Sequence, residues 1–107
     1  MGYGGIQIND GSAMIREKIT YRLHAVKRMF ERKISEKEVR YALETGEVIE
    51  DYPDDTPYPS RLILSCYRGR LIHVVAANNS LDDEIIIITV YEPDPTEWDG
   101  ECRKRIQ

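Results

Sequence analysis

With 107 residues, of which 41% are hydrophobic and 32% charged, the chain is long enough for one domain with a hydrophobic core and too short for two. Its longest uninterrupted apolar run is Ile85–Ile88, far below the roughly 18 residues of a membrane-spanning helix. These features exclude a disordered chain and a membrane span. The N-terminus lacks a basic stretch followed by an apolar one, so we expect a cytoplasmic protein.

The net charge of −4 conceals a strong segregation of charge along the chain. Nine Lys or Arg and four Glu lie between Arg16 and Arg40, whereas residues 44–55 hold six acids and no base. A basic face on an acidic protein can still steer a polyanion, because local charge governs the encounter. The acidic total nevertheless argues against tight non-specific binding to nucleic acid.

The N-terminal part of the chain is expected to pass from a flexible lead into helices. Residues 1–11 are rich in glycine and predict the lead, and residues 12–107 predict a single α+β domain. Ser12 is a candidate cap for a short helix over residues 13–18. A second helix is expected over about residues 21–32.

Two stripes at helical spacing divide the expected helix 21–32. One stripe is apolar and predicts the side that faces the core. The other combines an imidazole with guanidinium groups, which can meet a phosphate or a carboxylate. A solvated flank whose arginines pair with acids elsewhere is the alternative interpretation. The apolar stripe contains Leu23, Val26, Met29 and Phe30, and the polar stripe contains Tyr21, His24, Arg28 and Arg32.

A capping box marks the start of the next helix. Ser35 and Glu38 have the spacing at which each side chain satisfies the other residue's backbone N–H. The helix is expected to run to about Thr45, and Gly46 is placed to end it in the left-handed conformation. The residues expected to face the core are Val39, Ala42 and Leu43.

After Gly46 the apolar pattern has a period of two, which predicts strands. A proline-rich loop over residues 53–60 interrupts the strands, and Arg68–Arg70 is a tight hairpin turn in which Gly69 can take a positive φ. The fold class is therefore α+β, with two to three N-terminal helices packed on one face of a four-stranded antiparallel sheet. The expected strands are residues 48–52, 62–67, 71–77 and 84–91.

Two histidines suggest a catalytic site. His73 lies in the middle of an expected strand and is either a satisfied core or sheet-face histidine, or the partner of His24 across the helix–sheet interface. In the second case the pair can cleave RNA without a metal ion: one group takes the 2′-OH proton, another protonates the 5′-oxygen, and Arg28 or Arg32 stabilises the phosphorane. Tyr91 is either an acid or stacking platform, or an edge aromatic that covers the core.

Three further residues are candidates for contacts with a substrate. Tyr58 can stack on a base or simply pin the proline loop, and Arg70 at the hairpin tip can bind a phosphate or merely aid solubility. Arg103 in the basic C-terminal run is the third. Trp98 is expected to act as a lid over one end of the core.

The possible metal ligands do not form a recognisable site. His24, Cys66, His73 and Cys102 match no zinc-finger spacing, so no metal site is predicted. Nucleotide-cofactor fingerprints are also absent, and no cofactor is expected. Cys66 is expected to be a small buried hydrophobe. A disulfide between the two cysteines stays open at this point.

Six motifs follow one another along the chain: His24–Val39, Gly46–Pro53, Pro57–Ser60, His73–Val75, Thr89–Asp94 and Trp98. Together they resemble a bacterial and archaeal domain of unknown function over about residues 15–105. The order of helices and then sheet is similar to RelE-like toxins, including the BrnT and MqsR types. This resemblance implies an mRNA endoribonuclease, which can act on ribosome-associated mRNA and which a small antitoxin of zinc-finger type holds inactive.

Two functional hypotheses follow from these patterns. The first is a metal-independent mRNA endoribonuclease, the toxin component of a toxin–antitoxin pair. The second is a non-catalytic module that uses the basic helix face to bind an acidic protein or nucleic acid. Under the first hypothesis the catalytic candidates are His24, Arg28, His73 and Tyr91, and the substrate-binding candidates are Arg32, Tyr58, Arg70 and Arg103.

Overall fold

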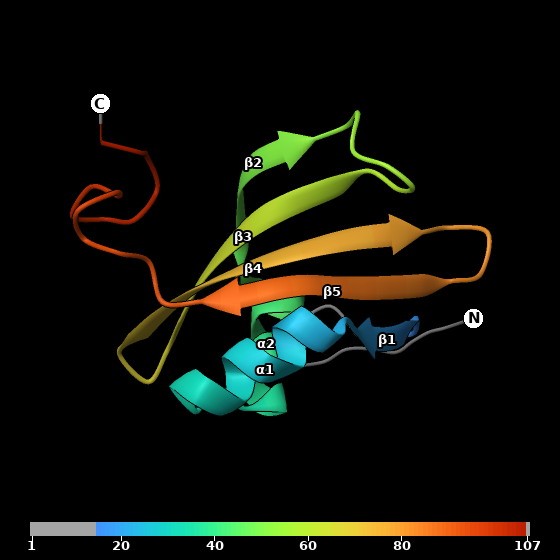
Figure 1. Cartoon of the computed structure of the whole chain (residues 1–107), viewed down its shortest axis with the longest axis horizontal. Helices are drawn as coiled ribbons and strands as arrows, with labels where there is room; N and C mark the ends of the chain where they lie inside the picture. The colour runs from blue at the N-terminus through green and yellow to red at the C-terminus, as the bar shows by residue number, and fades with distance from the viewer. Residues whose placement is uncertain (1–14, 107) are drawn as a thin grey trace.

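The computed structural model describes residues 15–106. In this part of the chain, two helices and a five-stranded mixed sheet make up the fold (Figure 1). The strands follow the order β1-β5-β4-β3-β2 across the sheet. Neighbouring strands are antiparallel except β1 and β5, which are parallel. The elements are β1 (Lys18–Tyr21), α1 (Leu23–Arg32), α2 (Glu36–Thr45), β2 (Glu47–Tyr52), β3 (Ser60–Tyr67), β4 (Arg70–Asn79) and β5 (Glu84–Tyr91).

The strand β1 corrects the prediction of a helix in this part of the chain. Lys18 and Tyr21 are helical in the prediction, but they pair with β5 and extend the sheet to five strands. The side chain of Thr20 donates a hydrogen bond to Glu84 at 2.6 Å. β-branched and aromatic residues favour the extended backbone, and the free edge of β5 supplies hydrogen bonds that a short helix would lack. Residues 13–14 of the expected first helix lie outside the described residues.

The four antiparallel strands lie where the sequence predicts them, each extended by no more than two residues at either end. The hairpin between β3 and β4 turns through Arg68 (φ 53°) and Gly69 (φ 82°). Two consecutive positive φ angles match the twist of the flanking strands. The expected turn at Gly69 is therefore confirmed.

The helix α2 confirms the strongest signal in the sequence. Ser35 and Glu38 form the reciprocal capping box, and the helix ends at Thr45. The sequence predicts a left-handed conformation for Gly46, but the residue is extended, with φ −72°. Glycine is needed there because a Cβ atom would lie 2.4 Å from the side chain of Ile63 and 2.5 Å from the carbonyl oxygen of Ala42. The end of α2 thus touches β3 closely.

The main core lies between the helices and one face of the sheet. Ala25 of α1 and Val39 of α2 are completely buried there, and Ala42 is nearly so. Ile72 and Val74 of β4 meet them from the sheet. Because side chains alternate along a strand, His73, which lies between Ile72 and Val74, points to the other face of the sheet. We call that other face, which carries His73 and Tyr91, the outer face.

The apolar stripe of α1 does not face the core, contrary to the prediction. Leu23 is 76% exposed, Phe30 86% and Val26 48%; only Ala25 is completely buried, while Met29 packs on the rim of the core. The hydrophobic pattern of a helix shows which side is apolar, but not whether the sheet extends far enough to cover it. Here α1 packs against β5 and offers the stripe to solvent.

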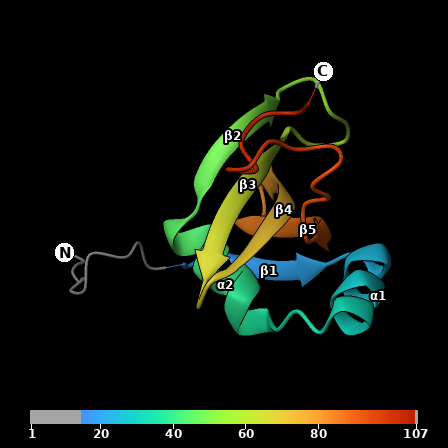
Figure 2. The ribbon, with the colours of Figure 1, turned by 90° about the vertical axis from the view of Figure 1, so that its left-hand side faces the viewer.

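The arrangement leaves α1 and the C-terminal segment on either side of β5. In Figure 2, α1 lies below the end of β5 and the C-terminal segment above it. The backbone N–H of Arg22 donates to the carbonyl oxygen of Ile87 at 2.9 Å, which fixes the start of α1 halfway along β5. Among the described residues, no helix is both long and apolar enough to cross a membrane.

Candidate functional site

The C-terminal segment folds over one end of the outer face. Trp98 is 2% exposed, and its ring lies nearly perpendicular to that of His73 with the ring centroids 4.4 Å apart. The guanidinium of Arg105 stacks over the other side of Trp98 at 4.5 Å from the ring centroid. Trp98 is therefore the lid that the sequence predicts, and it covers a second, smaller core on the outer face.

His73 is enclosed beneath this lid. It is 0% exposed, and its Nε2 lies 2.8 Å from the carbonyl oxygen of Cys102. A carbonyl can only accept, so Nε2 carries the proton and Nδ1 accepts a hydrogen bond from the Tyr91 hydroxyl, 3.3 Å away. Burial lowers the pKa of His73 below its ordinary value, which keeps the ring neutral.

The geometry of His73 agrees with one of the two interpretations that the sequence leaves open, that of a satisfied buried histidine. Ile72 and Val74, not His73, face the helices, so no cleft between His73 and His24 forms at the helix–sheet interface. The alternative interpretation, in which His73 pairs with His24 across that interface, does not agree with this geometry. Strand β4 is apolar on both faces because the helices cover one face and Trp98 covers part of the other. The sequence alone does not show which of the two faces packs against the helices.

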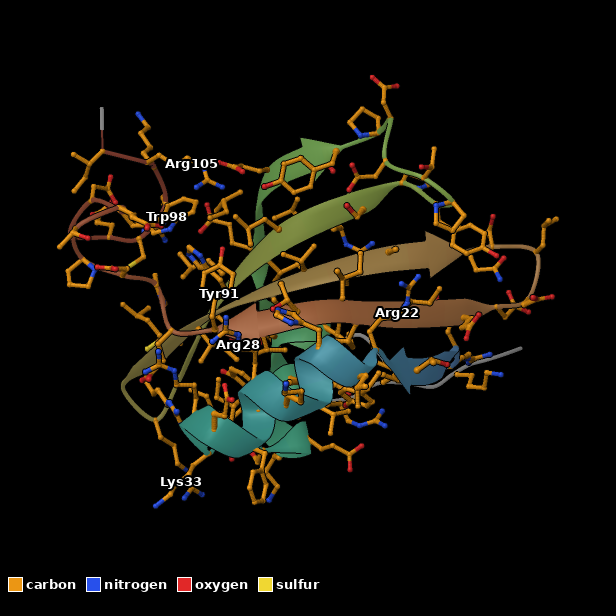
Figure 3. All side chains as sticks on the ribbon, in the orientation of Figure 1. Arg22, Arg28, Lys33, Tyr91, Trp98 and Arg105 are labelled. Carbon is orange, nitrogen blue, oxygen red and sulfur yellow. The ribbon has the colours of Figure 1, made fainter. Side chains whose placement is uncertain are left out.

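The polar flank of α1 remains accessible. His24 and Arg28 are exposed and lie one helical turn apart, with Arg32 one turn further along. Figure 3 shows Arg28 extending from α1 toward β5, as does Arg22 from the junction of β1 and α1, whereas Lys33 extends away from the sheet. Arg28 has only a long ion pair with Glu31, at 3.7 Å between two half-exposed side chains, and such pairs contribute little. Its guanidinium is therefore available to a ligand.

A pocket on the outer face brings Tyr58 and Arg22 together. It has a volume of about 360 Å³ and contains Ala77 of β4 and Ile88 of β5 in its floor. Acidic and polar residues of the proline loop complete it. Arg22 was missed as a site residue because the sequence analysis placed it inside a helix instead of at the junction of β1 and α1. The loop residues that line the pocket are Asp54, Asp55, Thr56, Pro57 and Tyr58.

Arg70, a predicted substrate contact, is instead engaged with the fold. Its guanidinium donates to the carbonyl oxygen of Lys33 at 2.9 Å and to that of Arg32, the last carbonyls of α1. It also lies 3.2 Å from the carboxylate of Glu92 and 3.5 Å from that of the buried Glu38. Arg70 thus ties the end of α1 to the capping box of α2 and to the end of β5.

The basic C-terminal residues are paired with acids on β2. Arg103 lies 3.0 Å from Glu47, and Arg105 lies 3.4 Å from Glu50. Tyr52 donates its hydroxyl to Glu50, and burial together with this bond raises the pKa of Tyr52 to about 12. These contacts hold the C-terminal segment on the sheet, and Arg103 has a carboxylate partner in Glu47 although its side chain is 45% exposed.

The cysteines and acids do not form a metal centre in the described part of the chain. Within residues 15–106, no three His, Cys, Asp or Glu side chains lie close enough together to hold an ion. Both cysteines are free thiols. Cys66 is exposed and Cys102 is buried, which corrects the expectation for Cys66. Cys66 points to the outer face, beyond the residues of β3 that pair with β2, where it lines a shallow pocket with Glu101 and Arg103.

The fold is thus an α+β domain in which a helix carrying exposed histidine and arginine lies along one strand of a mixed sheet. Residues 21–92 match the family of a domain of unknown function, DUF4258, and the chain belongs to that family. No curated protein matches the chain. No solved structure matches it either.

Proposed function

We propose that the protein is a metal-independent endoribonuclease that cleaves single-stranded mRNA, and that it is the toxin component of a toxin–antitoxin pair. One observation carries the proposal. His24 and Arg28 are both exposed and lie one turn apart on α1. Arg28 extends toward β5, whose last residue is Tyr91 (Figure 3). An imidazole beside a guanidinium is the combination that transesterification of RNA requires.

The residues of this flank have distinct roles in the proposed reaction. The imidazole of His24 takes the proton of the ribose 2′-OH, and the resulting oxygen attacks the adjacent phosphorus. Arg28 stabilises the negative charge that develops on the phosphate oxygens. The bond to the 5′-oxygen breaks, and the Tyr91 hydroxyl gives that oxygen the proton that it otherwise donates to Nδ1 of His73. The products are a 2′,3′-cyclic phosphate and a 5′-hydroxyl end.

His73 is a positioning residue in this mechanism. It has no exposed surface, and its Nδ1 accepts the hydrogen bond of the Tyr91 hydroxyl at 3.3 Å. The bond between His73 Nε2 and the carbonyl oxygen of Cys102 fixes the ring in turn. His73 therefore holds the phenol of Tyr91 at the rim of the outer face without touching the substrate.

The pocket between Arg22 and Tyr58 is the proposed site for a nucleotide next to the cleaved bond. The ring of Tyr58 can stack on an unpaired base, and the carboxylates of Asp54 and Asp55 can accept hydrogen bonds from amino groups on the base edge. Arg22 and Arg32 supply positive charge along α1 for the phosphates. Such a pocket suits single-stranded RNA, in which bases are free to turn outward.

The resemblance to RelE-like toxins supports the same proposal. The order of α1 and α2 followed by the antiparallel strands β2–β5 agrees with it in part, whereas β1 precedes the helices and pairs in parallel with β5. The proposed partner is a small antitoxin of the zinc-finger type. This support is an analogy of layout, and a shared layout alone does not carry an activity. The activity rests on the α1 flank.

A second candidate function is binding without cleavage. The burial of His73 favours it, because the accessible flank then holds a single histidine, His24, and acid and base must come from different residue types. In that case the basic flank of α1 holds RNA or an acidic protein. The same substitutions then weaken binding, and no product forms.

The test is cleavage of a fluorescent single-stranded RNA by the purified protein in excess EDTA. We expect His24→Ala to lower the rate by about 10²–10⁴-fold and Arg28→Ala by about 10²–10³-fold. Lys37→Ala, an exposed basic position on α2, is the matched control and is expected to change nothing. Induced expression should arrest growth only when His24 and Arg28 are intact. RNA that stays intact but is retained on a filter by the wild-type protein would establish the binding function instead.

A further inference from the structure

The apolar stripe of α1 is an unusual surface for a domain of this size. Leu23, Val26 and Phe30 recur at intervals of three and four residues, so they form one continuous line along the helix. Phe30, the only phenylalanine in the chain, is 86% exposed and Leu23 76%. Single exposed apolar residues are common, whereas a contiguous patch of them marks an interaction surface.

The stripe borders two hollows that meet at Val26 and Met29. One has a volume of about 580 Å³ and runs along α1 into the turn before α2. The other, of about 330 Å³, reaches back to Tyr21 at the end of β1. Together they form an apolar groove wide enough for the side chains of a docking helix. Around the first hollow the lining residues are Val26, Met29, Phe30, Lys33, Ile34 and Ser35.

Two lysines border the first hollow of this groove, whereas one acidic residue, Glu36, lines the second hollow. Lys33 lines the first hollow, and Lys27 lies four residues after Leu23 and three before Phe30, next to the stripe. Neither lysine forms an ion pair with any residue that the structure describes. A second copy of the chain docked through the same surface would bring a second set of these lysines to the interface, and like charges in one interface are unfavourable. An acidic partner would pair with them.

We propose that the apolar stripe and its groove bind an acidic amphipathic helix of a partner protein. Apolar side chains of that helix, spaced by three and four residues, enter the groove, and its Asp or Glu side chains pair with Lys27 and Lys33. The proposal is independent of the ribonuclease activity. The stripe lies on the opposite flank of α1 from His24 and Arg28, so the partner and the RNA use different sides of one helix.

The test measures fluorescence polarisation of labelled peptides of roughly 18 residues with the full chain. The first peptide carries Leu at helical spacing and Glu on the flanks; the second has every Glu replaced by Lys. We expect saturable binding of the acidic peptide that weakens at high salt, and at least about tenfold weaker binding of the basic one. Phe30→Ser and Lys27→Glu should each lower the affinity for the acidic peptide by about tenfold or more. Leu81→Ser, a leucine 94% exposed in the turn between β4 and β5, is the matched control and should change nothing.

Four results would overturn the proposal. The first is no saturable binding of the acidic peptide up to about 0.5 mM wild-type protein. The second is equal binding of both peptides, which indicates non-specific apolar contact. The third is a dimer in sedimentation that Phe30→Ser dissolves, because the occupant is then a second copy. The fourth is peptide binding that emerges only when residues 1–14 are deleted, because the chain then fills its own groove. None of these results bears on cleavage of RNA, which is measured separately with the His24 variant.

Discussion

Replacing Arg70 by alanine is the perturbation that most directly tests how α1 is held in place. The side chain of Arg70 is 28% exposed and contacts two carbonyls at the end of α1, together with Glu92 and Glu38. The side chain of Glu38 is only 10% exposed, so its carboxylate loses a cationic partner where water replaces it poorly. Hydrogen bonds to charged groups contribute about 1.5–3 kcal/mol each when buried, and water at the exposed carbonyls recovers part of this.

We therefore expect Arg70→Ala to lower the free energy of unfolding by about 2–3 kcal/mol. For a domain of this size that corresponds to a fall in Tm of about 10–20 °C. The assay is urea unfolding, monitored by far-UV circular dichroism. The comparison requires that the variant and the wild type have the same m value. Glu92→Ala removes only a half-exposed ion pair and should cost about 0–1 kcal/mol. If Arg70→Ala is within about 0.5 kcal/mol of the wild type, the arginine is a surface group and the account of α1 is wrong.

Three other changes have defined outcomes. Gly46→Ala forces a Cβ atom to 2.4 Å from Ile63, so urea unfolding should show a loss of about 1–3 kcal/mol, whereas Gly100→Ala, in open space, should show almost none. The pKa of His73 is lower in the folded state than its ordinary value of 6.5. As the pH falls, the unfolded state therefore binds the proton before the folded state does. The free energy of unfolding should fall as the pH drops below 6.5, by at most about 1.4 kcal/mol per pH unit. His73→Gln should flatten that slope between pH 7 and 5. Phe30→Ser should leave unfolding within about 0.5 kcal/mol of the wild type, and a large loss would show that Phe30 is core.

Local chemistry made part of the fold predictable. The Ser35–Glu38 capping box, the hairpin turn at Gly69 and the four antiparallel strands depend on neighbours within a few residues, and all are found. The strand β1 could not be predicted in the same way. It has only four residues, and what stabilises it is the edge of β5, more than 60 residues later in the chain. Tertiary pairing of this kind overrides weak local preference.

The candidate site was predictable in its residue types and less so in its geometry. Periodicity correctly placed His24 and Arg28 on one flank of α1, because the helix itself fixes that relation. The burial of His73 depends on Trp98, which lies 25 residues further on and folds back over the outer face. Likewise, the charge pattern around Arg70 did not reveal that its partners are the carbonyls at the end of α1. Contacts between distant segments decide both cases.

The most direct test of the central claim is the identity of the RNA ends that the protein leaves. If His24, Arg28 and Tyr91 act as proposed, cleavage in EDTA yields a 2′,3′-cyclic phosphate and a 5′-hydroxyl. A single 2′-deoxy substitution at the cleaved nucleotide then abolishes the reaction, because the attacking oxygen is gone. Ends that carry a 5′-phosphate, or cleavage that survives the deoxy substitution, would contradict the account.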